Sequence, residues 1–108
     1  MIQDIIGRLK TLRLNIVNSP DFNTYSTNKA KNLIDQVLQT FIKLNNRSSY
    51  TTDRVLNSFS LNGNHSIKNR LQIMNDMSNT RMTIKISPGI PSEMKKYILS
   101  KLDIILKL

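Results

Sequence analysis

The stretch SEMKKYILSKLDIILKL, residues 92–108, carries more apolar side chains than a helix needs against a single core. Pro91 suits the first turn of a helix, where its missing N–H costs nothing, and Glu93 suits the positive end of the helix dipole. On a helical wheel the apolar side chains form two adjacent seams that together span more than half the circumference. The first seam holds Met94, Ile98, Ile105 and Leu108, and the second holds Leu99, Leu102 and Leu106. The stretch therefore predicts a long C-terminal helix that is buried on two sides.

Two arrangements explain burial on two sides. In the first, the second seam packs against another copy of the chain, which makes Leu99, Leu102 and Leu106 the predicted interface of a homodimer. In the alternative, the helix lies between two elements of its own domain. A chain of 108 residues offers few elements to surround one helix, so self-association is the favoured expectation.

Two further helices are predicted in the N-terminal half. Residues 2–17 place apolar side chains at alternating steps of three and four, and Pro20 excludes a helical conformation just before it. A second helix is expected from about Asn28 to Asn45, with Ser26 or Thr27 as its N-cap.

Residues 52–78 read as two short helices broken at Asn62-Gly63-Asn64. The first begins near Thr52 or Asp53 and stops at Gly63, which tolerates the conformations that end a helix. The second is capped by Ser66. Its predicted buried stripe is Ile67, Leu71 and Met74, with Ile73 and Met77 at the margins. This order of elements predicts a possible helix-turn-helix at 52–78.

The period of the pattern changes after Asn79. In RMTIKIS, residues 81–87, apolar and polar side chains alternate, which is typical of a strand, and Pro88-Gly89 then turns the chain. The predicted fold class is mainly α, with about five helices and one short β-strand near 81–87 before a long C-terminal helix. Residues 1–108 form one predicted domain in which no repeat is apparent.

The charge balance invites an anionic partner. The chain has 16 basic and 7 acidic residues, a net charge of +9. Asn and Gln can pair with adenine, and Lys and Arg can bind guanine or phosphate. Against base reading, Asp76 is negative on the same face, and no alanine precedes Gly63 at the usual distance. The alternative is a polar face turned to solvent. The candidate nucleic-acid-binding residues are Arg54, Asn64, His65, Lys68, Asn69, Gln72 and Lys85.

The composition argues against catalysis and against metal or cofactor binding. The chain has no cysteine and one histidine, and its carboxylates are scattered singly, so we expect no enzyme, metal site, cofactor or small-molecule substrate. Apolar runs are only a few residues long, which makes a membrane partner unlikely on sequence grounds. Charged residues interrupt the first helix where a signal peptide would be apolar, so a cytoplasmic location is expected.

Two functional hypotheses follow. The leading one is a small basic DNA-binding regulator or accessory protein, acting in transcription regulation as a homodimer through its C-terminal helix. The alternative is a non-enzymatic protein-interaction module, such as an adaptor, inhibitor or assembly factor, whose basic surface meets an acidic protein partner.

Overall fold

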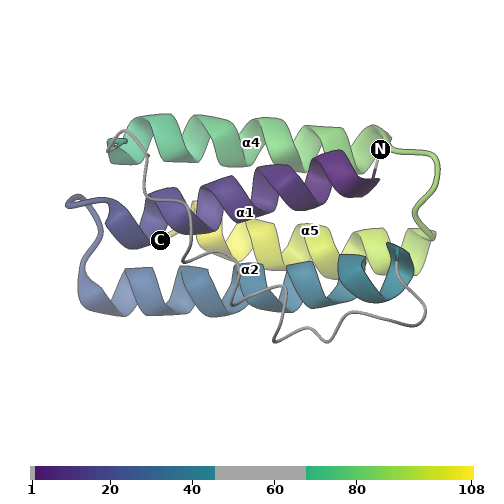
Figure 1. Cartoon of the computed structure of the whole chain (residues 1–108), viewed down its shortest axis with the longest axis horizontal. Coiled ribbons are helices and arrows are strands. Elements are labelled where there is room, and N and C mark those ends of the chain that lie inside the picture. The colour runs from purple at the N-terminus through teal and green to yellow at the C-terminus, as the bar shows by residue number, and fades with distance from the viewer. Residues whose placement is uncertain (1, 46–67) are drawn as a thin grey trace.

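Four α-helices make up the part of the chain that a computed structural model describes, residues 2–45 and 68–108 (Figure 1). They are α1 (Ile2–Asn18), α2 (Thr24–Asn45), α4 (Arg70–Ile86) and α5 (Ser92–Leu106). Helices α1 and α2 form one antiparallel hairpin, and α4 and α5 form a second. The mainly α class is confirmed, and the described ranges contain no strand.

The two hairpins pack against each other as a four-helix bundle. Helix α1 contacts α2 and α4, and α5 contacts α4 and α2, so each helix has two neighbours. Every neighbouring pair runs antiparallel, while α1 and α5 lie diagonally and run in the same direction (Figure 1). None of the described helices is long and apolar enough to cross a membrane.

Each helix contributes one apolar stripe to a shared core. On α1 and α4 the stripe follows the steps of three and four residues that keep side chains on one helical face. Full burial of one such side chain contributes roughly 1.5–3 kcal/mol. The stripes are Ile5, Leu9, Leu12 and Ile16 on α1; Ala30, Leu33, Ile34, Val37, Leu38, Phe41 and Ile42 on α2; Ile73, Met77 and Ile84, with the buried polar residue Thr80 between them, on α4; and Ile98, Leu102 and Ile105 on α5.

The second hairpin repeats the first at an offset of 68 residues. Helix α1 spans residues 2–18 and α4 spans 70–86, while α2 begins at residue 24 and α5 at residue 92. The buried stripe of α1 maps position by position onto that of α4 under the same offset. The expectation that the chain holds no repeat is therefore wrong.

The repeat extends to side-chain detail at the turns and between the helices. Ser-Pro begins both turns, with Ser19 and Ser87 both buried. In each hairpin an arginine Nε donates to an aspartate 22 residues later at 2.6 Å. Seven of the forty positions aligned between 1–40 and 69–108 are identical: Ile5/Ile73, Arg13/Arg81, Ile16/Ile84, Ser19/Ser87, Pro20/Pro88, Asp35/Asp103 and Leu38/Leu106. So low an identity left the repeat hidden in the sequence alone.

An approximate two-fold axis relates the hairpins. It exchanges α1 with α4 and α2 with α5, and both of these cross-hairpin contacts are antiparallel, as a two-fold axis perpendicular to the helices requires. The bundle therefore has within one chain the arrangement that two copies of a single hairpin would form as a dimer.

The predicted strand at 81–87 is wrong. These residues continue α4, which runs unbroken to Ile86. Ile84 satisfies both patterns, because it alternates with Lys85 and also lies four residues beyond Thr80 on the buried face. Packing against the core selects the helix over the strand preference of β-branched residues.

The predicted helix from Ser66 to about Ser78 has a later start and a different buried face. Helix α4 begins at Arg70, and Leu71, predicted to be buried, is 70% exposed, whereas Ile73 and Met77 are fully buried. Because the predicted helix stopped near Ser78, it left out Thr80 and Ile84, which together with Ile73 and Met77 form the face that packs inward. The predicted short helix after Thr52, its stop at Gly63 and the Ser66 cap lie outside the described residues.

Helices α1 and α5 are confirmed at the predicted places, whereas α2 begins earlier than predicted. Its first residue is Thr24, because the Asn23 side chain accepts a hydrogen bond from the Ser26 N–H at 2.7 Å and caps the helix there. Ser26 and Thr27, the predicted caps, are inside the helix.

Helix α5 is buried on two sides within its own chain. It contacts α4 on one side and α2 on the other, which is the alternative to a dimer seam. Leu102 is fully buried in the core and offers no surface to a second copy, so its assignment to a dimer interface is corrected. Leu99 and Leu106 are partly buried against the same core. Self-association stays a prediction.

Replacing Asn15 with Leu should stabilise the bundle. Asn15 is 5% exposed on α1, and its buried Nδ2 has no hydrogen-bond partner. An unsatisfied buried polar group costs roughly 1–3 kcal/mol, and leucine has the same branched arrangement of side-chain heavy atoms as asparagine. We expect Asn15→Leu to raise the free energy of unfolding by about 1 kcal/mol in urea denaturation. The same change at exposed Asn18 serves as the control and should have little effect; a loss of stability at Asn15 would show that its amide has a partner.

The two equivalent ion pairs should differ in strength. Arg13 and Asp35 are 16% and 18% exposed, and a second contact at 3.5 Å joins them, whereas Arg81 and Asp103 are 30% and 44% exposed. Less solvent screening strengthens a pair. Double-mutant cycles to alanine should give a coupling energy of about 1–2 kcal/mol for the first pair and below about 1 kcal/mol for the second. Equal coupling energies would contradict the screening argument.

Candidate functional site: the outer surface of helix α4

The predicted nucleic-acid-binding residues at the start of α4 have structural partners. Asn69 is the N-cap: its side-chain oxygen accepts from the Gln72 N–H at 2.8 Å, and the Gln72 side-chain oxygen accepts from the Asn69 N–H at 3.2 Å. Lys68 pairs with Asp76 at 3.1 Å. This reciprocal capping box occupies the two amide oxygens that base reading would use.

The other predicted nucleic-acid-binding residues do not form one surface with Lys68, Asn69 and Gln72. Lys85 lies thirteen residues after Gln72, about 20 Å farther along the helix axis, so the two cannot contact neighbouring bases. Arg54, Asn64 and His65 lie outside the described residues. The described residues therefore do not assemble a base-reading surface at the start of α4.

The turn of the first hairpin holds the start of α4. The Arg70 N–H donates to the Asp21 carboxylate at 3.0 Å, and the Arg70 guanidinium lies over the Phe22 ring at 4.9 Å from its centroid. Arg70 is the first residue of α4, so a charge-assisted hydrogen bond satisfies one of its otherwise unpaired helix-start N–H groups. These contacts fix the second hairpin against the first.

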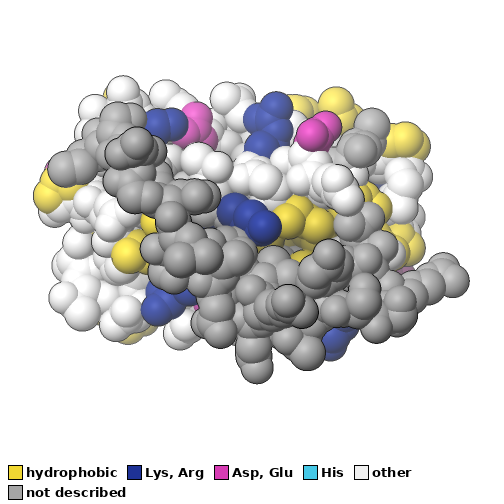
Figure 2. All heavy atoms as spheres, viewed as in Figure 1, with side chains coloured by type: hydrophobic (Ala, Val, Ile, Leu, Met, Phe, Trp, Pro, Cys, Tyr) yellow, Lys and Arg dark blue, Asp and Glu magenta, His cyan; other side chains and the backbone are white. Residues whose placement is uncertain are grey.

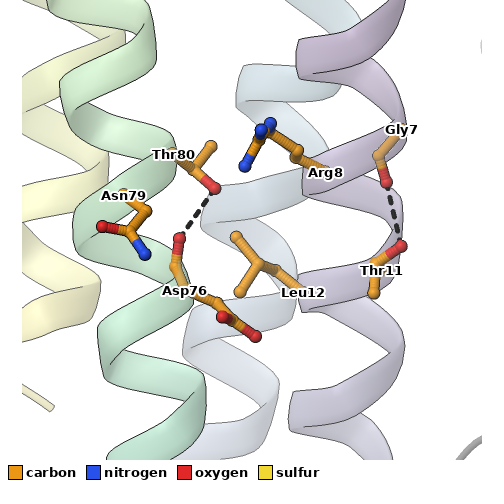
Figure 3. Close-up of a pocket in the computed structure, with 7 residues that line it drawn as sticks. All are labelled: Gly7, Arg8, Thr11, Leu12, Asp76, Asn79 and Thr80. Carbon is orange, nitrogen blue, oxygen red and sulfur yellow. Dashed lines mark hydrogen bonds between the residues drawn. The ribbon is translucent and has the colours of Figure 1, made fainter.

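A shallow groove of about 340 Å³ lies on the solvent side of the contact between α1 and α4 and is lined mostly by polar residues (Figure 3). Its walls are made of equivalent positions in the repeat: Arg8, Thr11 and Leu12 of α1 correspond to Asp76, Asn79 and Thr80 of α4. Gly7 completes the lining. The groove therefore lies on the approximate two-fold axis.

The groove offers no reactive pair of side chains. The Thr11 and Thr80 hydroxyls donate to their own helices, to the Gly7 carbonyl at 3.0 Å and the Asp76 carbonyl at 2.8 Å (Figure 3). The Asp76 carboxylate is neutralised by Lys68, and Arg8 is exposed. Across the described ranges, no three acidic or histidine side chains gather as metal ligands would. The groove is thus a polar seam between two helices.

A different surface, at the far end of α4, combines exposed apolar and basic groups. We call it the α4–α5 corner and define it by Met82, Lys85, Ile86, Lys95 and Lys96. Met82 and Ile86 are 53% and 71% exposed. In Figure 2, hydrophobic side chains reach the surface over the end of the bundle where α4 leads into α5, at the upper right. Exposed apolar side chains that lie together and are rimmed by polar residues mark protein interaction sites.

The cations of the corner have distinct roles. Lys95 Nζ donates to the Lys85 carbonyl at 3.1 Å and so satisfies an acceptor in the last turn of α4. Lys85 and Lys96 are exposed, and neither makes an ion pair with another described residue. Lys96 lies in the second turn of α5, after Glu93 in the first turn. The corner therefore favours an anionic group.

Of the predicted nucleic-acid-binding residues, only Lys85 belongs to this corner, and it was assigned to a strand. The strand assignment hid the exposed face of α4, because it placed Met82 and Ile86 on the same strand face as Ile84. The signal that could have found it is the four-residue step from Met82 to Ile86, which on a helix puts both on the face opposite Ile84 and Met77.

The chain matches no known protein family, and no curated protein or solved structure is significantly similar to it.

Removing the N-cap of α4 should weaken the fold. Asn69→Ala deletes a cap hydrogen bond and should lower the free energy of unfolding by about 1 kcal/mol, with a smaller loss for Gln72→Ala. Asn75→Ala, at an exposed position within α4, is the matched control and should be neutral or slightly stabilising. Chemical denaturation measures all three. If Asn69→Ala were as stable as Asn75→Ala, the capping role would be excluded.

Proposed function

We propose that the chain is a non-enzymatic protein-interaction module that binds an acidic protein segment at the α4–α5 corner. The observation that carries the proposal is the exposure of Met82 and Ile86 at the same end of α4 as Lys85, an exposed cation without an ion-pair partner among the described residues. Lys96, a second such cation, follows Lys95, whose Nζ donates to the Lys85 carbonyl at 3.1 Å. An acidic segment would supply the missing counter-charges, and its apolar side chains would cover the exposed ones.

The distribution of charge supports an acidic partner. Among the described residues, Asp35, Asp76 and Asp103 are each paired with a basic side chain inside the bundle. In the second hairpin, residues 68–108, eight basic residues stand against three acidic ones, and two of those three acids are already paired. The excess positive charge is therefore left for a partner, whose association it would accelerate.

DNA binding is the weaker of the two hypotheses for this structure. Only the net charge of +9 supports DNA binding, and the same charge would attract an acidic protein equally well. On the face shown in Figure 2, the visible Lys and Arg side chains are scattered, whereas a duplex is held by cations that follow its phosphates. Asn69 and Gln72 make their hydrogen bonds within α4.

Charge reversal at the corner should weaken binding of an acidic polypeptide. With fluorescein-labelled poly-L-glutamate as probe, we expect Lys85→Glu with Lys96→Glu to raise the Kd about tenfold in fluorescence anisotropy at low salt. The control carries the same charge change at two exposed lysines of α2, Lys29→Glu with Lys43→Glu, and should raise the Kd less than threefold.

Two outcomes would overturn the proposal. Equal losses in both double variants would mean that net charge alone, and no corner site, holds the probe. Binding of a 20-base-pair DNA duplex that survives 150 mM salt and is lost in Gln72→Ala would favour the DNA reader instead.

A further inference from the structure

Helix α4 exposes apolar side chains at both ends of its outer face, with polar residues between them. Leu71 is 70% exposed, and Met82 and Ile86 lie on the same side of the helix, with Asn75 and Ser78 between them. The steps from 71 to 75, 78, 82 and 86 are of four, three, four and four residues, which keep side chains in one row. We call this row the α4 outer face.

The repeat provides a comparison for the α4 outer face inside the same molecule. Helix α1 occupies the equivalent place in the bundle, with Gln3 at the position of Leu71 and Asn18 at that of Ile86. Both polar residues are exposed, and α1 packs as well as α4 does. The bundle therefore does not require leucine or isoleucine at these two positions.

The length and charge of the α4 outer face define what would cover it. Leu71 and Ile86 are fifteen residues apart, about 22 Å along the helix, which matches four turns of a second helix. Lys85 borders the row, and the row itself contains no acidic residue; Asp76 lies on the side of the groove, paired with Lys68. A matching helix would have apolar side chains at steps of three and four and acids beside them.

We propose that the α4 outer face binds an acidic amphipathic helix of about four turns from a partner protein. The inference rests on the proposed function and specifies the partner's structure. Leu71 and Ile86 would anchor the two ends of the helix, Met82 would adapt to its side chains, and Lys85 would pair with an acid.

The test exchanges α4 residues for those that α1 has at the same positions. The variant Leu71→Gln with Ile86→Asn keeps its melting temperature, because both side chains are exposed. The probes are two labelled 18-residue acidic peptides of identical composition: one places its leucines in an amphipathic pattern, and the other is scrambled. We expect the wild type to bind the patterned peptide at least tenfold more tightly than the scrambled one, and the variant to lose this preference.

The peptide, sedimentation and vesicle measurements distinguish failure of the helix proposal from failure of the proposed function. If both peptides bind equally and the variant changes nothing, the helix proposal fails, while charge-dependent binding at the corner can still stand. If sedimentation shows a dimer that the variant dissociates, a second copy covers the face. If the variant abolishes binding to anionic phosphatidylserine vesicles, a lipid surface covers it. Either of the last two results also overturns the proposal.

Discussion

The rest of the structure depends on the burial of one apolar face per hairpin against the other hairpin. A hairpin of two helices has an inner face that neither helix can cover alone, and in this chain the partner hairpin is covalently attached. The antiparallel contacts of α1 with α4 and of α2 with α5 close the core. They also explain why apolar side chains occupy so much of the circumference of α5: the helix is buried against α2 on one side and α4 on the other.

Sequence periodicity was a sound guide where a helix had one clear stripe and clear ends. Helix α1 and the C-terminal helix fall into this class, since Pro20 and Pro91 mark boundaries that the structure keeps. In α4 hydrophobic periodicity gave the wrong element, because the residues of RMTIKIS fit both the alternation of a strand and the spacing of a helix. Short-range alternation cannot choose between the two; the choice comes from Ile73 and Met77, a full turn or more away, whose core contacts exist only in the folded bundle.

The candidate site was harder to predict than the fold. Asn69 and Gln72 have the side chains of a base reader, but the same amides three residues apart form a capping box, and sequence alone did not separate these roles. Leu71 was expected in the core because the predicted helix stopped near Ser78 and its stripe was taken as Ile67, Leu71 and Met74. The helix in fact continues to Ile86, and Ile73, Met77, Thr80 and Ile84 form its buried face, which leaves Leu71, Met82 and Ile86 on the outer side.

The groove between the hairpins also bears on which hairpin pairs with which. Helices α1 and α4 are alike enough to exchange places, so a first hairpin could meet the first hairpin of another molecule. Arg8 and Asp76 occupy corresponding positions on the two walls and carry opposite charges. In a like-with-like assembly, arginine would face arginine or aspartate would face aspartate, and such contacts are repulsive. The opposite charges of Arg8 and Asp76 thus favour contact between unlike hairpins, by a small amount because Arg8 is exposed, Asp76 is partly exposed and Lys68 already pairs with Asp76.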